Sequence, residues 1–556
     1  MPHRPLSRVV SRTRFWIVLA AGLFYAVPAD ARPVARGVID FTCMVPMRDG
    51  THLATDVYVP RFPRGAYPII LVRTTDGKDQ VTKLMARYVC RRGCGLVVQD
   101  VRGRHDSGGR NVVVFFDDGW GRNRDGHDTL RWIARQPWCN GRIATWGVSA
   151  MGVMENMLAP DAPTNLKAQH VMFAFSDMYS QAAYQGGVLR QSLVDGWLKG
   201  KGFAPINVER LLANPTYGPR WEGLNCETQA ARVNTPAVFW GGWYDIFLQG
   251  TINSFVTIHN QGGPGARGRC RLILGPWNHH DAERLADPRN AGCFPAAGDA
   301  FRFFEYYLRG EANGAGCDRP VHYYVMGACE PRAPGNHWRT ADNWPPQAEE
   351  TNFYFHADGS LNRETPQEAD GRRTYEYNPK EPVPTVGGLN MFGSYGPLDQ
   401  RKVESRPDVL LFTTAPLERP LEATGRIRAE LFVSSDCPDT DFTVKLTDVY
   451  PDGRSILLCD GILRARFHKS FEEENFLEPG KVYRLVVDLW STSYAFPKGH
   501  RIRVAVSSSN APRFQPNRNT GESPRAGGKP RIATNTLHLS PEHPSHIILP
   551  VYRAGK

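Results

Sequence analysis

Three residues of this sequence have the types needed for nucleophilic catalysis: Ser149, Asp245 and His279. A serine hydroxyl attacks a carbonyl only when a neighbouring base takes its proton, and a carboxylate orients that base. Ser149 lies in the string GVSAMG, whose glycines permit a sharp turn. The string alone is weak evidence for a nucleophile, since ordinary turns match it as well. The acid and the histidine that follow it in the chain therefore decide whether Ser149 is a nucleophile.

The segment around Ser149 predicts a strand, a turn and a helix in immediate succession. Residues 143–146 are apolar and partly β-branched, which indicates a buried strand. Residues 150–159 are rich in Ala, Met and Leu and end at Pro160, which indicates a helix. Ser149 is then expected at the carboxyl edge of a sheet, as in a nucleophile elbow. The backbone N–H of Ala150, at the helix N-terminus, is placed to donate to an oxyanion.

The candidate acid and base also follow apolar strands. Residues 237–240 run into GGWYD, which ends at Asp245, and residues 272–274 run into GPWNH, which ends at His279. Taken singly, the aspartate could be a helix cap and the histidine a structural residue. Together with Ser149 they follow the order serine, acid, histidine at equivalent strand ends, which favours a catalytic triad of the α/β-hydrolase type.

The wider pattern predicts how the chain is divided. Apolar strands alternate with helices in the first half, which indicates an α/β fold with a parallel sheet. The alternation breaks before residue 231, where segments 178–198 and 207–213 read as helices of a cap over the site. Later strands are short and separated by turns, which indicates an all-β sandwich. The expected parts are a first hydrolase segment, a helical cap, a second hydrolase segment and a β domain, at 32–165, 166–230, 231–312 and 313–556.

The N-terminus predicts export. Four arginines precede an apolar run at residues 15–27, and Ala29-Asp30-Ala31 fits a signal-peptidase site. We expect cleavage after Ala31 and a periplasmic or extracellular location. The alternative is an uncleaved membrane anchor, although the run is short for a bilayer. No other stretch is long and apolar enough to cross a membrane.

Charge and cysteine content restrict the partners. Removing residues 1–31, with four Arg and one Asp, lowers the formal net charge from +11 to +8. The basic residues are dispersed, so no nucleic-acid site is expected. Eleven cysteines are an odd number, which leaves at least one thiol unpaired if the exported chain forms disulfides. The local disulfide candidates are Cys90 with Cys94 and Cys437 with Cys459.

Longer strings identify a family resemblance. The sequence resembles the cocaine esterase and X-prolyl dipeptidyl peptidase family, which also holds α-amino acid ester hydrolases and glutaryl acylases. The resemblance covers nearly the whole chain after residue 31 and implies an α/β-hydrolase domain, a helical cap and a C-terminal jelly-roll. It also implies that Ser149, Asp245 and His279 form the triad. The strings that carry it are QDVRG, DGHDTLRWIARQPWCNGRIATWG, GGWYD, GPWNH, DTDFTVKLTDVYPDGRS and PRFQPNRNTG.

Two departures from the family pattern concern the oxyanion hole. The family usually has Tyr directly after the nucleophile, where this chain has Ala150. The family's oxyanion tyrosine lies in an Arg-x-Pro-Tyr string after the first buried strand, where this chain has Arg73-Thr74-Thr75-Asp76. An ionised Asp76 there would repel a developing oxyanion. Either Asp76 points away or is protonated, or Thr74 or Thr75 donates in its place.

The substrate side is less specific. Relatives that take α-amino acid esters hold the ammonium with acidic residues, part of which follow the triad aspartate. Ile246-Phe247 occupies that place here, which argues against an α-amino substrate. Asp177 is a lone acidic candidate, and a helix cap is the simpler interpretation. Aromatic side chains that suit either an acyl pocket or the core are Trp146, Phe175, Tyr179, Trp243 and Trp277.

The sequence therefore predicts an exported serine hydrolase that cleaves an ester or amide of a small molecule or short peptide. No cofactor is expected. No metal is expected either, because His279 is already assigned and no third ligand has zinc spacing beside His280. The alternatives are an X-prolyl dipeptidyl peptidase and a non-catalytic ligand- or carbohydrate-binding protein with a decayed site. The sequence leaves open the natural substrate and whether the chain forms a homo-oligomer.

Overall fold

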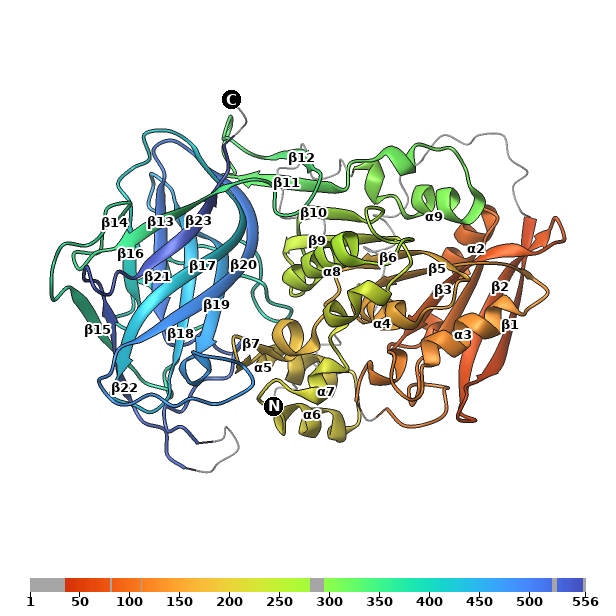
Figure 1. Cartoon of the computed structure of the whole chain (residues 1–556), viewed down its shortest axis with the longest axis horizontal. Coiled ribbons are helices and arrows are strands. Elements are labelled where there is room, and N and C mark those ends of the chain that lie inside the picture. The colour runs from red at the N-terminus through yellow and green to blue at the C-terminus, as the bar shows by residue number, and fades with distance from the viewer. Residues whose placement is uncertain (1–35, 81–82, 112, 281–294, 523–527, 554–556) are drawn as a thin grey trace, which may run out of the picture.

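The computed structural model describes residues 36–80, 83–111, 113–280, 295–522 and 528–553 (Figure 1). The predicted signal peptide at residues 1–31 lies outside the described residues. Figure 1 shows a layered α/β part and a β-sandwich side by side, with short helices of an inserted segment beneath the junction. The expected fold class is confirmed.

A mainly parallel sheet forms the centre of the α/β part. The neighbouring strands β4, β3, β5, β6, β9, β10 and β11 run parallel. Antiparallel strands complete both edges, β2 and β1 beside β4 and β12 beside β11. In spatial order the strands are β1 (Arg36–Pro46), β2 (His52–Phe62), β4 (Gly95–Asp100), β3 (Tyr67–Thr74), β5 (Cys139–Val148), β6 (Leu166–Met172), β9 (Ala237–Tyr244), β10 (Arg271–Asn278), β11 (Val321–Gly327) and β12 (His337–Ala341). Buried parallel strands of this kind read as continuous apolar runs, which is why the sequence revealed them.

Helices cover both faces of this sheet, because successive strand residues point to opposite sides. On β3, Ile69 and Leu71 pack in one apolar cluster with residues of α3, whereas Ile70 and Val72 pack in another with residues of α2. The helices are α2 (Lys83–Arg91), α3 (Asp125–Ala134), α4 (Ala150–Leu158), α8 (Leu248–Gln261) and α9 (Ala300–Arg309). The sheet therefore carries a helical layer on each face.

The inserted segment between β6 and β9 is the cap, and it differs from the sequence prediction. The expected helix over 178–198 is wrong, because a hairpin at Gly186-Gly187 splits it into two short helical pieces. Both glycines have positive φ, and a Cβ on Gly186 would lie 1.8 Å from the carbonyl oxygen of Ile462. In chain order the cap contains the π-helical turn η4 (Tyr179–Ala183), β7 (Tyr184–Gln185), β8 (Val188–Leu189), α5 (Gln191–Leu193), π-helix η5 (Val194–Lys199), α6 (Pro205–Leu212), α7 (Pro219–Glu222) and η6 (Cys226–Arg232).

The C-terminal part is a sandwich of two mainly antiparallel sheets. Phe355 and Phe412 stack with ring centroids 4.5 Å apart and join the sheets through the core. One sheet has the order β16 (Leu410–Thr413), β21 (Arg501–Ser507), β18 (Asp441–Val449) and β19 (Ser455–Arg464). The other contains β13 (Glu349–Phe355), β14 (Leu361–Asn362), β15 (Arg372–Tyr377), β17 (Leu421–Ser435), β20 (Tyr483–Phe496), β22 (Ala533–His538) and β23 (His546–Val551), while the short helix α10 (Arg401–Glu404) precedes β16.

The structure locates two of the expected domain boundaries, at residues 166 and 313, relative to the strands of the central sheet. Residue 166 begins β6, so the segment outside the central sheet starts after Met172. The boundary before residue 313 precedes β11 and β12, and β11 pairs with β10 through Val321–Tyr323. The last residues of β11, Met326 and Gly327, pair instead with β20 of the sandwich. One strand is thus shared by the two parts.

Both local disulfide predictions are wrong. Cys90 and Cys94 are buried but not joined, and Cys437 and Cys459 are likewise buried and not joined. Their side chains pack as small apolar groups, and burial raises the pKa of the Cys94 thiol to about 11. Among the described residues no helix is long and apolar enough to cross a membrane.

Candidate active site

Ser149 lies on a strained turn between β5 and α4. Its φ of 57° and ψ of −125° are unfavourable for a residue with a side chain, so the surroundings must impose them. The turn is tight because a Cβ on Gly147 would lie 2.5 Å from the Met151 carbonyl carbon. The Ser149 N–H donates to the Met172 carbonyl (2.9 Å), and the Ser149 carbonyl accepts from the Val153 N–H (2.9 Å). The hydroxyl is therefore presented at the carboxyl edge of the sheet.

The structure brings Ser149, His279 and Asp245 together in one chain of hydrogen bonds. His279 Nε2 is 2.9 Å from Ser149 Oγ, and His279 Nδ1 is 2.6 Å from Asp245 Oδ2. Asp245 follows β9 and His279 follows β10, which are neighbouring parallel strands paired up to Tyr244 and Asn278. The spatial neighbourhood expected from the two strand ends is therefore present.

The surroundings of Asp245 fix the tautomer of the imidazole. Asp245 is fully buried, and its second oxygen, Oδ1, accepts from the Phe247 N–H at 2.8 Å. A carboxylate with both oxygens engaged holds Nδ1–H toward itself. Nε2 of His279 is then left as the acceptor for the Ser149 hydroxyl.

The segment after β3 holds the oxyanion candidates. Thr74 Oγ1 accepts from the Asp76 N–H at 3.0 Å, so this hydroxyl is engaged in the turn. Thr75 is 1% exposed, and its Oγ1 is buried with no hydrogen-bond partner among the described residues. β3 and β5 are neighbouring parallel strands, and Thr75 follows the end of β3 as Ser149 follows the end of β5. Thr75 therefore has an unsatisfied hydroxyl at the same edge of the sheet as the elbow.

Asp76 is drawn toward the cap. Its Oδ2 lies 3.4 Å from Lys201 Nζ, and Lys201 follows η5. Arg104 supports the same junction, because it donates to the carbonyls of Thr75 (3.1 Å), Lys201 (2.8 Å) and Gly202 (3.0 Å). One carboxylate oxygen of Asp76 thus has a cationic partner in the cap, whereas Oδ1 is buried with no hydrogen-bond partner among the described residues.

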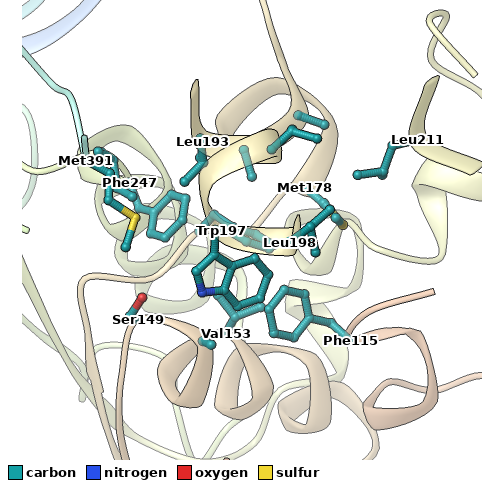
Figure 2. A pocket seen from close by; sticks show the side chains of 16 residues that line it. Phe115, Ser149, Val153, Met178, Leu193, Trp197, Leu198, Leu211, Phe247 and Met391 are labelled. Atoms are coloured by element: carbon teal, nitrogen blue, oxygen red, sulfur yellow. The ribbon is translucent and has the colours of Figure 1, made fainter. Parts of the chain in front are cut away.

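An apolar cavity of about 40 Å³ opens beside Ser149, and we call it the Ser149 cavity (Figure 2). Side chains from the α/β part, the cap and the β domain line it, so all three parts contribute. Ser149 carries the one hydroxyl group among them. The lining residues are Phe115, Ser149, Ala150, Val153, Phe175, Met178, Ala182, Ala183, Leu193, Val194, Trp197, Leu198, Leu211, Ile246, Phe247 and Met391.

Phe175 is the one predicted substrate residue that lines this cavity. Trp146 packs edge-to-face against Phe301 of α9, with ring centroids 5.7 Å apart. Trp277 stacks on Trp240 at 5.2 Å. These two tryptophans are buried core residues and do not line the cavity. A large aromatic side chain on a central strand can serve either purpose, so the residue type alone does not reveal which.

The remaining predicted substrate residues also have structural partners. Trp243 Nε1 donates to the Tyr324 carbonyl at 2.7 Å, and the Tyr179 hydroxyl donates to the Pro215 carbonyl at 2.8 Å. Asp177 accepts from the Tyr179 N–H at 3.1 Å and from the Ser180 hydroxyl at 2.5 Å. Asp177 thus caps a helical turn, and burial raises the pKa of its carboxyl to about 6. It is not among the residues that line the Ser149 cavity.

Sequence reasoning missed two features of the site. The cap contributes most of the apolar wall, and η5 supplies Val194, Trp197 and Leu198 of it. Arg190 is fully buried and donates to the carbonyl of Ile246, the residue directly after Asp245, at 2.9 Å. Burial lowers the pKa of this guanidinium to about 9. The irregular cap pattern gave no signal for either, because helical periodicity does not extend through the hairpin.

The strained serine, the buried relay and the strand order define the class of this protein: it is an enzyme, a serine hydrolase with the α/β-hydrolase fold and a C-terminal β domain. The alternative of a non-catalytic binding protein is set aside. More narrowly, the chain belongs to the cocaine esterase family. It is 34% identical to the cocaine esterase of Rhodococcus sp. (strain MB1 Bresler), over 92% of this chain and 98% of that one.

Family models and solved structures agree with this assignment. A model described as X-Pro dipeptidyl-peptidase (S15 family) matches residues 49–205 and 204–281, and the X-Pro dipeptidyl-peptidase C-terminal non-catalytic domain matches 313–548. An aminopeptidase from a marine sediment Thaumarchaeota archaeon is 25% identical, with a TM-score of 0.77 over 95% of this chain and 99% of that one. An α-amino acid ester hydrolase, 24% identical, shares the fold with a TM-score of 0.80 over 98% and 100%.

Proposed function

We propose that this enzyme hydrolyses esters of small apolar acyl groups through an acyl-enzyme formed on Ser149. The observation that carries the proposal is the relay from Ser149 Oγ to His279 Nε2 (2.9 Å) and from His279 Nδ1 to Asp245 (2.6 Å), beside an apolar cavity. Nothing in this relay requires a cofactor.

The reaction follows from the positions of these groups. Ser149 Oγ attacks the acyl carbonyl carbon while His279 Nε2 takes the hydroxyl proton, and the imidazolium is stabilised by Asp245. The tetrahedral intermediate collapses when His279 returns the proton to the leaving alcohol oxygen. Water then attacks the acyl-enzyme with the same base, which releases the acid and restores the Ser149 hydroxyl.

Two donors are assigned to the oxyanion. The first is the N–H of Ala150, at the N-terminus of α4 where the helix dipole favours negative charge. The second is the hydroxyl of Thr75, which is buried and has no partner among the described residues. A donor left unsatisfied in the resting enzyme loses no existing bond when the oxyanion forms, so it favours the transition state over the ground state.

The lining of the Ser149 cavity favours a neutral acyl group over a peptide N-terminus. No acidic side chain lines it within the part of the chain that the structure describes. An X-prolyl dipeptidyl peptidase must hold an ammonium group, and an unpaired ammonium against apolar walls is strongly unfavourable. The two carboxylate oxygens of Asp177 are already engaged by the turn that it caps. The peptidase alternative therefore has weaker support.

Hydrolysis of p-nitrophenyl acetate and butyrate, compared with aminoacyl-proline anilides, tests this function. We expect ester turnover with the wild type, and less than about 1% of it with Ser149→Ala, because the nucleophile is lost. A fluorophosphonate probe should label the wild type and not Ser149→Ala. Ser192→Ala is the matched control, since Ser192 lies in the cap but does not line the cavity. Full ester activity in Ser149→Ala, or turnover of the anilides alone, would contradict the proposal.

We also propose that the enzyme is exported after cleavage next to Ala31. The support is the basic start, the apolar run and the small-residue site of the sequence. N-terminal sequencing of the protein from its native host should begin at or near Arg32. A protein in the cytoplasm that still begins at Met1 would contradict export and leave the hydrolase proposal untouched.

A further inference from the structure

A second and larger cavity adjoins the Ser149 cavity, and we call it the outer cavity. Its volume is about 420 Å³, roughly ten times that of the Ser149 cavity. Among the residues that the structure describes, Leu211 is the one that lines both cavities. The lining residues of the outer cavity that bear on the wall between the two are Val114, Phe116, Asn207 and Leu211.

Leu211 closes the far end of the Ser149 cavity. Figure 2 shows Ser149 and Leu211 on opposite sides of it, with Trp197 between them in this view. Leu211 is 5% exposed and is carried by α6. A substrate acyl chain that begins at Ser149 and follows the apolar walls therefore meets Leu211 before it reaches the larger space.

The wall that carries Leu211 is held in place by polar contacts. Asn207, one turn earlier on α6, accepts from the Val114 N–H (2.8 Å) and donates to the Asn111 carbonyl (3.1 Å). The Tyr184 hydroxyl donates to the Leu211 carbonyl at 3.1 Å. The helix backbone is thus fixed, so the side chain of Leu211 rather than a movement of α6 determines whether the cavities connect.

The loop opposite α6 completes the partition. Phe115 lines the Ser149 cavity, whereas its neighbours Val114 and Phe116 line the outer cavity. Phe115 has a φ of 70°, a left-handed conformation that is rare for a residue with a side chain. The Phe115 ring stacks on Trp197, another residue of the Ser149 cavity lining, with centroids 5.8 Å apart. The wall between the two cavities is thus formed by Leu211 of α6 and by Phe115 of the loop that faces α6.

We propose that Leu211 determines the acyl chain length accepted at Ser149, an inference that rests on the proposed esterase function. With Leu211 in place the site takes short acyl groups. When Leu211 is shortened, the two cavities form one channel that accepts unbranched medium-length fatty acyl chains. The ligand class of the enlarged site is therefore a medium-chain acyl ester.

The test compares kcat/KM for p-nitrophenyl butyrate and octanoate in the wild type and Leu211→Ala. Each buried methylene contributes a factor of about four, so burial of two additional methylenes raises the octanoate-to-butyrate ratio by about 15-fold. Leu211→Phe should lower the ratio. Leu212→Ala is the matched control, because Leu212 follows on the same helix and lines neither cavity. Its ratio should remain within twofold of the wild type.

The outcomes separate this inference from the proposed function. Absence of Ser149-dependent ester hydrolysis in the wild type would overturn both. Butyrate hydrolysis with an octanoate ratio unchanged by Leu211→Ala, or an equal rise in Leu212→Ala, would overturn the role of Leu211 alone. If Leu211→Ala loses its cooperative thermal transition, Leu211→Val replaces it, and its ratio should move in the same direction by about fourfold. An unchanged ratio in a folded Leu211→Val enzyme would likewise overturn the inference.

Discussion

Asp76 provides the sharpest test of how this enzyme departs from its relatives. Because Asp76 Oδ2 lies 3.4 Å from Lys201 Nζ, neutralising the carboxylate should weaken the attachment of the cap rather than relieve repulsion of an oxyanion. Lys201 follows η5, which carries Trp197 and Leu198 into the Ser149 cavity. We therefore expect Asp76→Asn to lower kcat/KM for p-nitrophenyl butyrate, mainly by raising KM.

The exposure of the two side chains sets the size of this effect. The side chain of Asp76 is 19% exposed and that of Lys201 is 42% exposed, so solvent screens much of their attraction. Exposed pairs contribute about 0.2–1 kcal/mol, and the partial burial of Asp76 favours the upper part of that range. About 1 kcal/mol corresponds to a fivefold change, so a two- to fivefold loss is expected.

A double-mutant cycle measures the coupling directly. Asp76→Asn and Lys201→Met should each lower kcat/KM, and the double variant should lose no more than either single variant. The losses should shrink at high salt. Lys199→Met is the matched control, since Lys199 ends η5 two residues before Lys201 but pairs with Asp195 (2.7 Å) at the surface. A tenfold gain in Asp76→Asn would refute this reasoning and indicate a carboxylate that opposes the oxyanion.

Two further predictions follow from buried groups near Ser149. Thr75→Val should lower kcat by about a hundredfold through loss of an oxyanion donor, whereas Thr74→Val should lower it less than about threefold; equal losses in stopped-flow ester hydrolysis would contradict the assignment. Burial raises the pKa of the Glu155 carboxyl well above its ordinary value, so the folded state retains a proton that the unfolded state loses. The resulting stability is full below about pH 4.5 and declines as pH rises, by about 1.4 kcal/mol per unit. Glu155→Gln should therefore stabilise the protein more at pH 8 than at pH 5 in thermal melts, and a pH-independent difference would argue against a protonated Glu155.

The clustering of Ser149, Asp245 and His279 was accessible from sequence because it depends on local signals. The apolar strands that become β5, β9 and β10 each end directly before a polar residue, and parallel strands bring their carboxyl ends to one edge. Fold class followed from the same alternation of strands and helices. No comparable regularity links distant segments, which is why the pairing of Asp76 with Lys201 was not predicted.

The cavity was the part that sequence could not provide. The predicted aromatic residues were selected by type, yet Trp146 and Trp277 pack in the core while Trp197 lines the cavity. Met391 reaches the cavity from an irregular stretch of the β domain. Which face of an element meets a cavity depends on the packing of other segments, and that information is absent from local periodicity.

The shared strand β11 has a consequence for protein engineering. The family models change at residue 313, which invites the exchange of catalytic halves between relatives at that point. β11 nevertheless pairs with β10 through Val321–Tyr323 and with β20 through Met326 and Gly327. A chimera joined at 313 would keep β11 with its own β20 but pair it with a foreign β10, and a truncation there would leave β10 as an open edge prone to aggregation. The catalytic half and the β domain should therefore be exchanged together rather than separately.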